Sequence, residues 1–262
     1  MEHRWQDLPW TAFADLPADT VAVLPVAAIE QHGPHLPVSV DTTINEALVT
    51  ATLKLLPDTA RVLVLPTQAI GLSVEHLRFA GTLTSSAETL LALWTDIGES
   101  VARAGVRRLL ILNSHGGQPQ LVDIVCRRLR ARARMLAVGC LWSRLGIPDG
   151  LDDPEGIHGG RVETSLMRHI APERVDMTQA RNFRSAWLDR AAAYATLSPE
   201  GAVGFGWETQ DLHPAGALGD ASLATAEDGE RLLRFTADRL AALIDDMRRF
   251  DLDTWLRDGP QH

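Results

Sequence analysis

The segment IEQHGPHLPVSVD, residues 29–41, follows a wholly apolar run and is rich in imidazole and carboxylate groups. Glu30 and His32 are two residues apart, so on extended backbone their side chains share one face and can reach the same small object. Asp41 follows the turn-rich GPHLP segment and is able to return to the same point from the other side. His35 lies on the opposite alternation from His32, so we expect it to brace the loop.

Two more polar clusters follow predicted strands or lie in glycine-rich loops. His115 stands in LNSHGGQ, where the glycines let the backbone turn sharply and bring a ligand close to the next helix N-terminus. His158 stands in GIHGGRVETS, with Glu163 one turn into the helix that follows. These three clusters supply imidazole and carboxylate ligands without thiolate, the mixture that zinc, manganese or ferrous iron prefers.

This ligand mixture predicts a metal site, and we expect it to hold two divalent ions with Asp41 able to bridge them. Two metals a few ångströms apart can share a hydroxide nucleophile and polarise a carbonyl group. That chemistry suits hydrolysis.

The elements that must position these residues alternate along the chain. Apolar, β-branched runs predict buried strands at 20–29, 60–66, 106–113 and 134–141. Helical spacing of apolar residues predicts helices at 42–56, 86–104, 118–132, 159–170 and 224–248. Such alternation is typical of an α/β fold with a mostly parallel sheet and helices on both faces, and ligands bind at the carboxyl ends of its strands. Residues 180–222 predict an irregular excursion, and we expect one domain over 1–262.

Composition limits the partners. The chain has 45% hydrophobic and 23% charged residues, ordinary values for a soluble globular protein. A net charge of -9 argues against a nucleic-acid or an anionic-membrane partner, and we expect neither. Cys126 and Cys140 lie in apolar runs and predict reduced, buried thiols. No stretch resembles a signal peptide or a membrane span, so we expect a cytoplasmic protein.

Four motifs resemble those of the creatininase (creatinine amidohydrolase) family: EQHGPHLPVSVD, GLSVEHLRFAGTLT, NSHGGQ and HGGRVETS. FGWETQDLHPAGALGDASLATAEDG resembles the C-terminal region of that family, so the resemblance runs from about residue 20 to residue 230. It implies the family's α/β fold, two divalent metal ions and a small-molecule substrate. The implied reaction is hydrolysis of a non-peptide carbon–nitrogen bond, in a cyclic amide or a formamide, by a metal-bound hydroxide. It also implies a homo-oligomer, often a hexamer.

The resemblance implies a role for each matching residue. Glu30, Asp41 and His115 match the ligands of one metal, while His32 and Asp41 match ligands of the second. His158 matches the catalytic histidine, which we assign to proton donation towards the departing nitrogen.

This chain departs from the creatinine-hydrolysing members at three positions. Those members take another ligand for the second metal from a Glu two residues after the third-strand histidine, where this chain has Gly117, and we expect Glu163 to substitute for it. They also place a Tyr and a Trp where this chain has Gly116 and Pro154. Because the aromatic walls for a flat ring are missing, we expect a substrate other than creatinine.

Ser73, Glu75 and His76 in GLSVEHLRFAGT, together with Gly116, are candidates for contact with substrate at the rim of the site. A polar structural loop is the alternative for the first three. Two other functions stay open: a deformylase of a cofactor pathway that uses one ferrous iron or zinc, and a non-catalytic protein that binds a metabolite or organises an assembly. Metal content distinguishes these three hypotheses: two equivalents per chain for the two-metal hydrolase, one for the deformylase and none for the non-catalytic protein.

Overall fold

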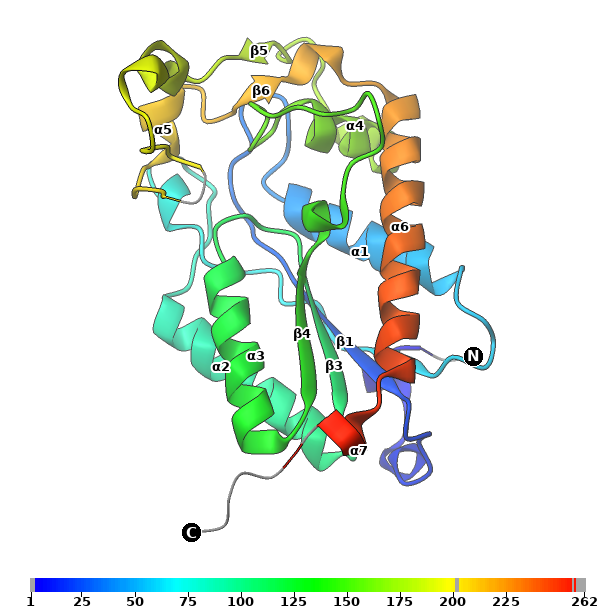
Figure 1. Ribbon diagram of the computed structural model, residues 1–262. Helices are drawn as coiled ribbons and strands as arrows, with labels where there is room; N and C mark the ends of the chain where they lie inside the picture. The colour runs from blue at the N-terminus through cyan, green and yellow to red at the C-terminus, as the bar shows by residue number, and fades with distance from the viewer. Residues whose placement is uncertain (1–2, 201–202, 256, 258–262) are drawn as a thin grey trace.

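The structure, a computed structural model, describes residues 3–200, 203–255 and 257. Its centre is a sheet of four parallel strands in the order β2-β1-β3-β4 (Figure 1). The strands are β1 (Val21–Val26), β2 (Val62–Val64), β3 (Arg108–Asn113) and β4 (Leu136–Leu141). Each lies inside a range that its apolar, β-branched composition predicted. The predicted α/β class with a mostly parallel sheet is confirmed.

Helices cover both faces of this sheet (Figure 1). On one face lie α1 (Val40–Leu53), α4 (Arg161–Ile170) and α6 (Ala226–Arg249), and on the other lie α2 (Ala87–Arg103) and α3 (Pro119–Ala133). Side chains of β1 alternate between the two layers: Val21 and Val23 pack with α1 and α6, whereas Ala22 and Leu24 pack with α2 and α3. Burial on both faces explains why the strands read as continuous apolar runs.

The predicted excursion over 180–222 is largely irregular, but it contains elements that the sequence did not indicate. β5 (Asn182–Phe183) pairs antiparallel with β6 (Gly219–Asp220), and α5 (Thr209–Leu212) lies between them along the chain. Figure 1 shows these elements above the carboxyl ends of the sheet strands. The N–H of Leu218 donates to the carbonyl of His158 at 2.7 Å, so the excursion also holds the loop that carries this histidine.

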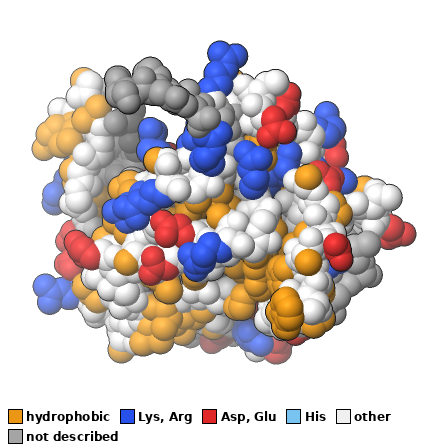
Figure 2. Space-filling view, turned by 90° about the horizontal axis from the view of Figure 1, so that it is seen from below, with side chains coloured by type: hydrophobic (Ala, Val, Ile, Leu, Met, Phe, Trp, Pro, Cys, Tyr) orange, Lys and Arg blue, Asp and Glu red, His pale blue; other side chains and the backbone are white. Residues whose placement is uncertain are grey.

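The opposite end of the molecule carries α7 (Leu252–Trp255) and the starts of the strands. Side chains of both charges are interspersed with hydrophobic ones on this face (Figure 2). Ion pairs join Arg107 to Asp253 and Arg248 to Asp19 here. Within the described ranges, no helix has both the length and the apolar character needed to cross a membrane. The assignment of 1–262 to one domain stays a prediction.

Candidate metal centre

The six residues predicted as metal ligands or catalyst gather beyond the carboxyl ends of β1 and β3. Glu30 and His32 follow β1, and the N–H of Glu30 donates to the carbonyl of Val38 at 2.9 Å. This bond closes the loop after β1 and places Asp41 in the first turn of α1, beside Glu30 and His32. His115 follows β3, which is hydrogen-bonded to β1 along its whole length. His158 comes from the loop before α4, and Glu163 from the first turn of that helix.

Their donor atoms form two groups that share Asp41, and Glu30, His32 and His158 form a third group. In the first group, His115 Nδ1 lies 3.0 Å from Glu30 Oε1 and 3.7 Å from Asp41 Oδ2. In the second, His32 Nε2 lies 3.6 Å from Asp41 Oδ1 and 3.9 Å from Glu163 Oε2. The two oxygens of Asp41 thus face different groups, which is the geometry of a bridging carboxylate. Spacings of this size fit ions with ligand bonds of about 2.0–2.3 Å.

Three buried atoms at these groups have no hydrogen-bond partner: Glu30 Oε2, Asp41 Oδ2 and His32 Nε2. Buried polar atoms are nearly always satisfied, so three orphans in one cluster indicate that a group is missing from it. A carboxylate oxygen and an imidazole lone pair are both satisfied by a divalent cation. The residues present therefore fit the metal ions that the sequence predicts, although their assignment as ligands stays a prediction.

Backbone carbonyls fix the orientation of both histidines. His115 Nε2 lies 2.6 Å from the carbonyl oxygen of Leu72, and His32 Nδ1 lies 3.0 Å from that of Glu30. Each ring therefore turns its other nitrogen towards the centre, as metal-binding histidines do. Asn113 supports His115 further, because its amide exchanges two hydrogen bonds with the backbone N–H and carbonyl of that residue, at 2.9 and 2.8 Å.

The buried carboxylates raise the pKa values of the two histidines beside them, so both imidazoles hold a second proton near neutrality. Burial opposes a charge on His115, but Glu30 and Asp41 outweigh it and raise its pKa to about 10. Burial likewise opposes a charge on His32, whose pKa Asp41 raises to about 9. Burial and the adjacent Glu30 raise the pKa of Asp41 to about 7. Protons on the two histidines thus supply positive charge next to the carboxylates.

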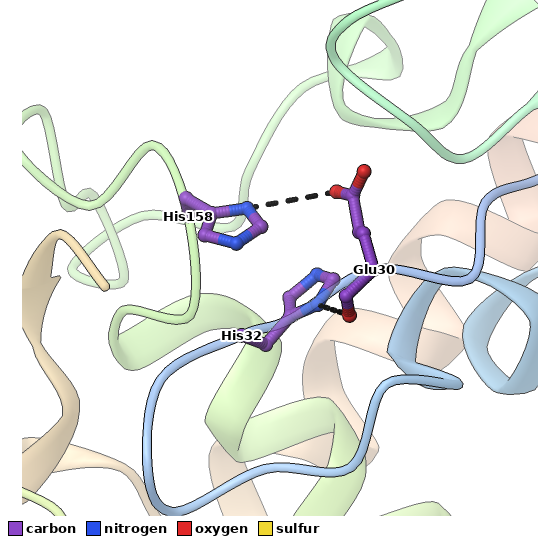
Figure 3. Close-up of side chains that lie close together, drawn as sticks. All are labelled: Glu30, His32 and His158. Atoms are coloured by element: carbon purple, nitrogen blue, oxygen red, sulfur yellow. Dashed lines mark hydrogen bonds and ion pairs between the residues drawn. The ribbon is translucent and has the colours of Figure 1, made fainter. Parts of the chain in front are cut away.

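His158 faces the centre from above (Figure 3). Its Nδ1 lies 3.8 Å from Glu30 Oε1, and its ring is 4.1 Å from that of His32 between centroids. Nε2 lies 2.6 Å from the carbonyl oxygen of Gln31, so this nitrogen carries a proton and the lone pair of Nδ1 faces Glu30. Burial, together with His32 and His76, holds the pKa of His158 well below its usual value.

The loop expected at the rim lies deeper than predicted. His76 is buried beside Glu30, with Nε2 3.5 Å from Glu30 Oε1, and Ser73 is buried too. Glu75 Oε1 lies 3.4 Å from His115 Nε2. Gly116 is open, because a Cβ built on it meets no atom within 4 Å. Contact of these four residues with a substrate stays a prediction.

His35 braces the loop as expected, with Nε2 3.1 Å from the carbonyl oxygen of Gly159 and 2.9 Å from Thr164 Oγ1.

Two other supporting residues, Gln31 and Asn113, were not identified from the sequence. The side chain of Gln31 lies 2.7 Å from His76 Nδ1. The position of Gln31 between Glu30 and His32 could have indicated this role. Alternation along extended backbone turns its side chain away from the metal groups and towards His76 and His158. Asn113 was overlooked as the last residue of a buried strand.

This chain is similar to known proteins over most of its length. The family model for creatininase (creatinine amidohydrolase) matches residues 6–244. A mycofactocin precursor peptide peptidase of Mycobacterium ulcerans is 34% identical over 248 residues, covering 92% of this chain and 88% of the relative. A creatinine amidohydrolase of Pseudomonas putida is 30% identical over 253 residues, covering 86% and 89%.

Solved creatininase structures have the same fold. One described as creatininase Mn superposes with a TM-score of 0.75 and 26% identity, over 94% of this chain and 98% of the other. A variant creatininase of the Zn-Zn type superposes with a TM-score of 0.74 and 27% identity, over 94% and 98%. These matches extend over nearly the whole chain, and the family's structures include manganese and zinc forms. The chain therefore belongs to the creatininase family of amidohydrolases.

Proposed function

We propose that this chain hydrolyses an amide carbon–nitrogen bond with the help of two divalent metal ions. The observation that carries the proposal is the pair of donor groups sharing Asp41, with three buried atoms left without a partner. Glu30 and His115 would hold one ion, and His32 and Glu163 the other. When bound, such ions polarise a substrate carbonyl and lower the pKa of a water molecule.

His158 is placed to move the proton that this reaction must transfer. Its Nε2 is tied to the carbonyl of Gln31, so only Nδ1 can exchange a proton at the centre. Because burial keeps the ring neutral, Nδ1 first accepts the proton that the attacking water loses. It then donates this proton to the departing nitrogen as the carbon–nitrogen bond breaks. The donor role predicted from the sequence is kept, but it follows an acceptor step.

Two substrate classes have support. An amide in a peptide is favoured by the mycobacterial relatives, which are named as peptidases. A Cβ on Gly116 meets no atom within 4 Å and Pro154 is exposed, and neither residue supplies an aromatic wall, which suits a larger substrate than creatinine. A cyclic amide or a formamide, the class that the sequence predicts, is favoured by the similarity to creatinine amidohydrolase.

The test begins with metal content. We expect about two equivalents of zinc or manganese per chain after loading, and hydrolysis of a member of one substrate class that stops on chelation and returns on reloading. The panel holds short peptides, N-formyl compounds, lactams and cyclic ureides. One equivalent would favour the deformylase alternative, and none would favour the non-catalytic one. Activity that survives complete chelation would overturn the proposal.

A pair of variants links the metals to these residues. Asp41→Asn removes one charge from the shared carboxylate and is expected to lower both metal content and turnover. Asp123→Asn is the matched control, because Asp123 is exposed on α3 and pairs only with Arg127 among the described contacts. An Asp41→Asn protein with full metal content and normal turnover would contradict the bridging role.

A further inference from the structure

His76 presents a choice that its position alone does not resolve. The ring is buried at the end of the 3-10 turn Val74–His76, and Nε2 faces Glu30 Oε1 at 3.5 Å and Glu75 Oε1 at 4.0 Å. These three residues form a further group of potential ligands beside the two that share Asp41. If Nε2 carries a lone pair, His76 is a third metal-binding histidine. If Nε2 carries a proton, it is a hydrogen-bond donor aimed at the centre.

Gln31 settles which nitrogen holds the proton. The backbone N–H of Gly33 donates to Gln31 Oε1 at 2.9 Å, and Gln31 Nε2 donates to the carbonyl of Gly216 at 2.7 Å. If the amide were turned over, its NH2 group would face the N–H of Gly33 and its oxygen would face the carbonyl oxygen of Gly216. Neither pair can form a hydrogen bond, so the orientation of this amide is fixed. Gln31 Nε2 also lies 2.7 Å from His76 Nδ1. Nδ1 must therefore accept a hydrogen bond.

Thr209 is compatible with this assignment. Its hydroxyl oxygen lies 2.8 Å from His76 Nδ1 and 3.1 Å from the carbonyl oxygen of Glu75. The single hydroxyl hydrogen can donate to only one of them, and the assignment requires it to point to Nδ1. A ring whose Nδ1 accepts is neutral, and its single proton lies on Nε2. The hydrogen-bond network around Gln31 thus turns an N–H group, rather than a lone pair, towards the centre.

We propose that His76 is a neutral N–H donor to the carbonyl oxygen of the scissile amide, and that Gln31 is the positioning residue that fixes its tautomer. The inference rests on the proposed amide hydrolysis. An oriented N–H group stabilises the negative charge that grows on this oxygen as water adds to the carbonyl carbon. His76 then takes no part in holding metal, unlike His32 and His115.

The tautomer can be read without any catalytic assay. In protein labelled with 15N at histidine, long-range 1H–15N spectra distinguish protonated from unprotonated ring nitrogens, and His76→Gln identifies the signals of His76. We expect a protonated Nε2 and an unprotonated Nδ1, both before and after loading with zinc alone. A proton on Nδ1, or a change of Nε2 to a metal-bound nitrogen on zinc loading, would overturn the proposal.

Variants then test the role in turnover. His76→Leu should keep the wild-type zinc content and lose about 10²–10³ in kcat, the usual cost of one such donor. His76→Gln, which can still offer an N–H group, should recover part of that loss. Gln31→Glu replaces the donor at Nδ1 with an acceptor, so it should move the proton of His76 to Nδ1 and lower kcat at unchanged zinc content.

The outcomes separate this proposal from the one on which it rests. A His76→Leu protein that loses an equivalent of zinc would show that His76 is a ligand, and one with normal kcat would show that it is no donor. Failure of the wild-type protein to hydrolyse any amide would instead remove the proposed function, while the spectra would still report the tautomer.

Discussion

Gly117 stands where the resemblance to creatinine-hydrolysing proteins predicts a Glu ligand, and a methyl group there should damage one metal-binding group. A Cβ built on Gly117 lies 2.1 Å from Glu75 Oε1 and 2.5 Å from His115 Nε2. The carboxylate is the end of a flexible side chain and can move aside. The imidazole cannot move as easily, because Nε2 contacts the carbonyl of Leu72 and Nδ1 contacts Glu30.

The geometry gives the size of the effect. Ordinary contact begins near 3.4 Å, so relieving a 2.5 Å approach requires His115 to withdraw by about 0.9 Å. Metal ligands tolerate errors of only about 0.2 Å. We therefore expect Gly117→Ala to weaken the binding of one ion at least as much as loss of a supporting residue does, about 10–100-fold. Crowding of the site should also lower the free energy of unfolding of the metal-free protein by about 1–3 kcal/mol.

Gly116→Ala is the matched control for this experiment. Its Cβ meets no atom within 4 Å, and neither glycine has a positive φ, so backbone strain does not separate the two variants. The control should change the free energy of unfolding by no more than about 0.5 kcal/mol. Competition with a chromophoric chelator measures zinc affinity, and denaturant unfolding measures stability. Equal zinc affinities for the two variants would refute the reasoning. Adding Glu75→Ala to Gly117→Ala should restore little, since the overlap with His115 remains.

Four more predictions concern the same site. Because the pKa values of His32 and His115 are raised to about 9 and about 10, protons occupy these nitrogens near neutrality and must leave when metal binds. Zinc affinity should therefore rise with pH up to about pH 10, and calorimetry in buffers of different ionisation enthalpy should show proton release; affinity independent of pH would contradict this. His158→Ala should keep its zinc and lose about 10²–10⁴ in turnover, and loss of an ion would make His158 a ligand instead. Glu163→Gln should bind one fewer ion, as counted by elemental analysis, while a full complement would remove Glu163 from the ligand set. Creatinine should be hydrolysed poorly by the zinc-loaded enzyme, and efficient turnover would show that the missing aromatic walls do not matter.

The strands and helices of this protein could be predicted from its sequence. Apolar runs such as VRRLLILN and helical spacing such as that of 86–104 predicted the strands and helices to within a few residues, because each pattern reflects burial on both faces of a sheet or on one side of a helix. Glu30, His32, His115 and Glu163 were predicted to converge from their placement at strand ends or at a helix start, from their ligand chemistry and from the resemblance to the creatininase family. The close spacing of Glu30, His32 and Asp41 needed only a short loop to bring them together.

Other features depend on contacts between distant segments. The order β2-β1-β3-β4 puts the ends of β1 and β3 side by side, which no local pattern encodes. His76 was expected at the rim but is buried against Glu30, because Thr209 and Gly216 from the excursion close over the loop and Gln31. The short pairing of β5 with β6 was also absent from the prediction, since two-residue strands have no detectable alternation. Sequence determined which groups are available for the chemistry, whereas tertiary packing decided how each ring is turned, because a tautomer depends on hydrogen-bond partners far away along the chain.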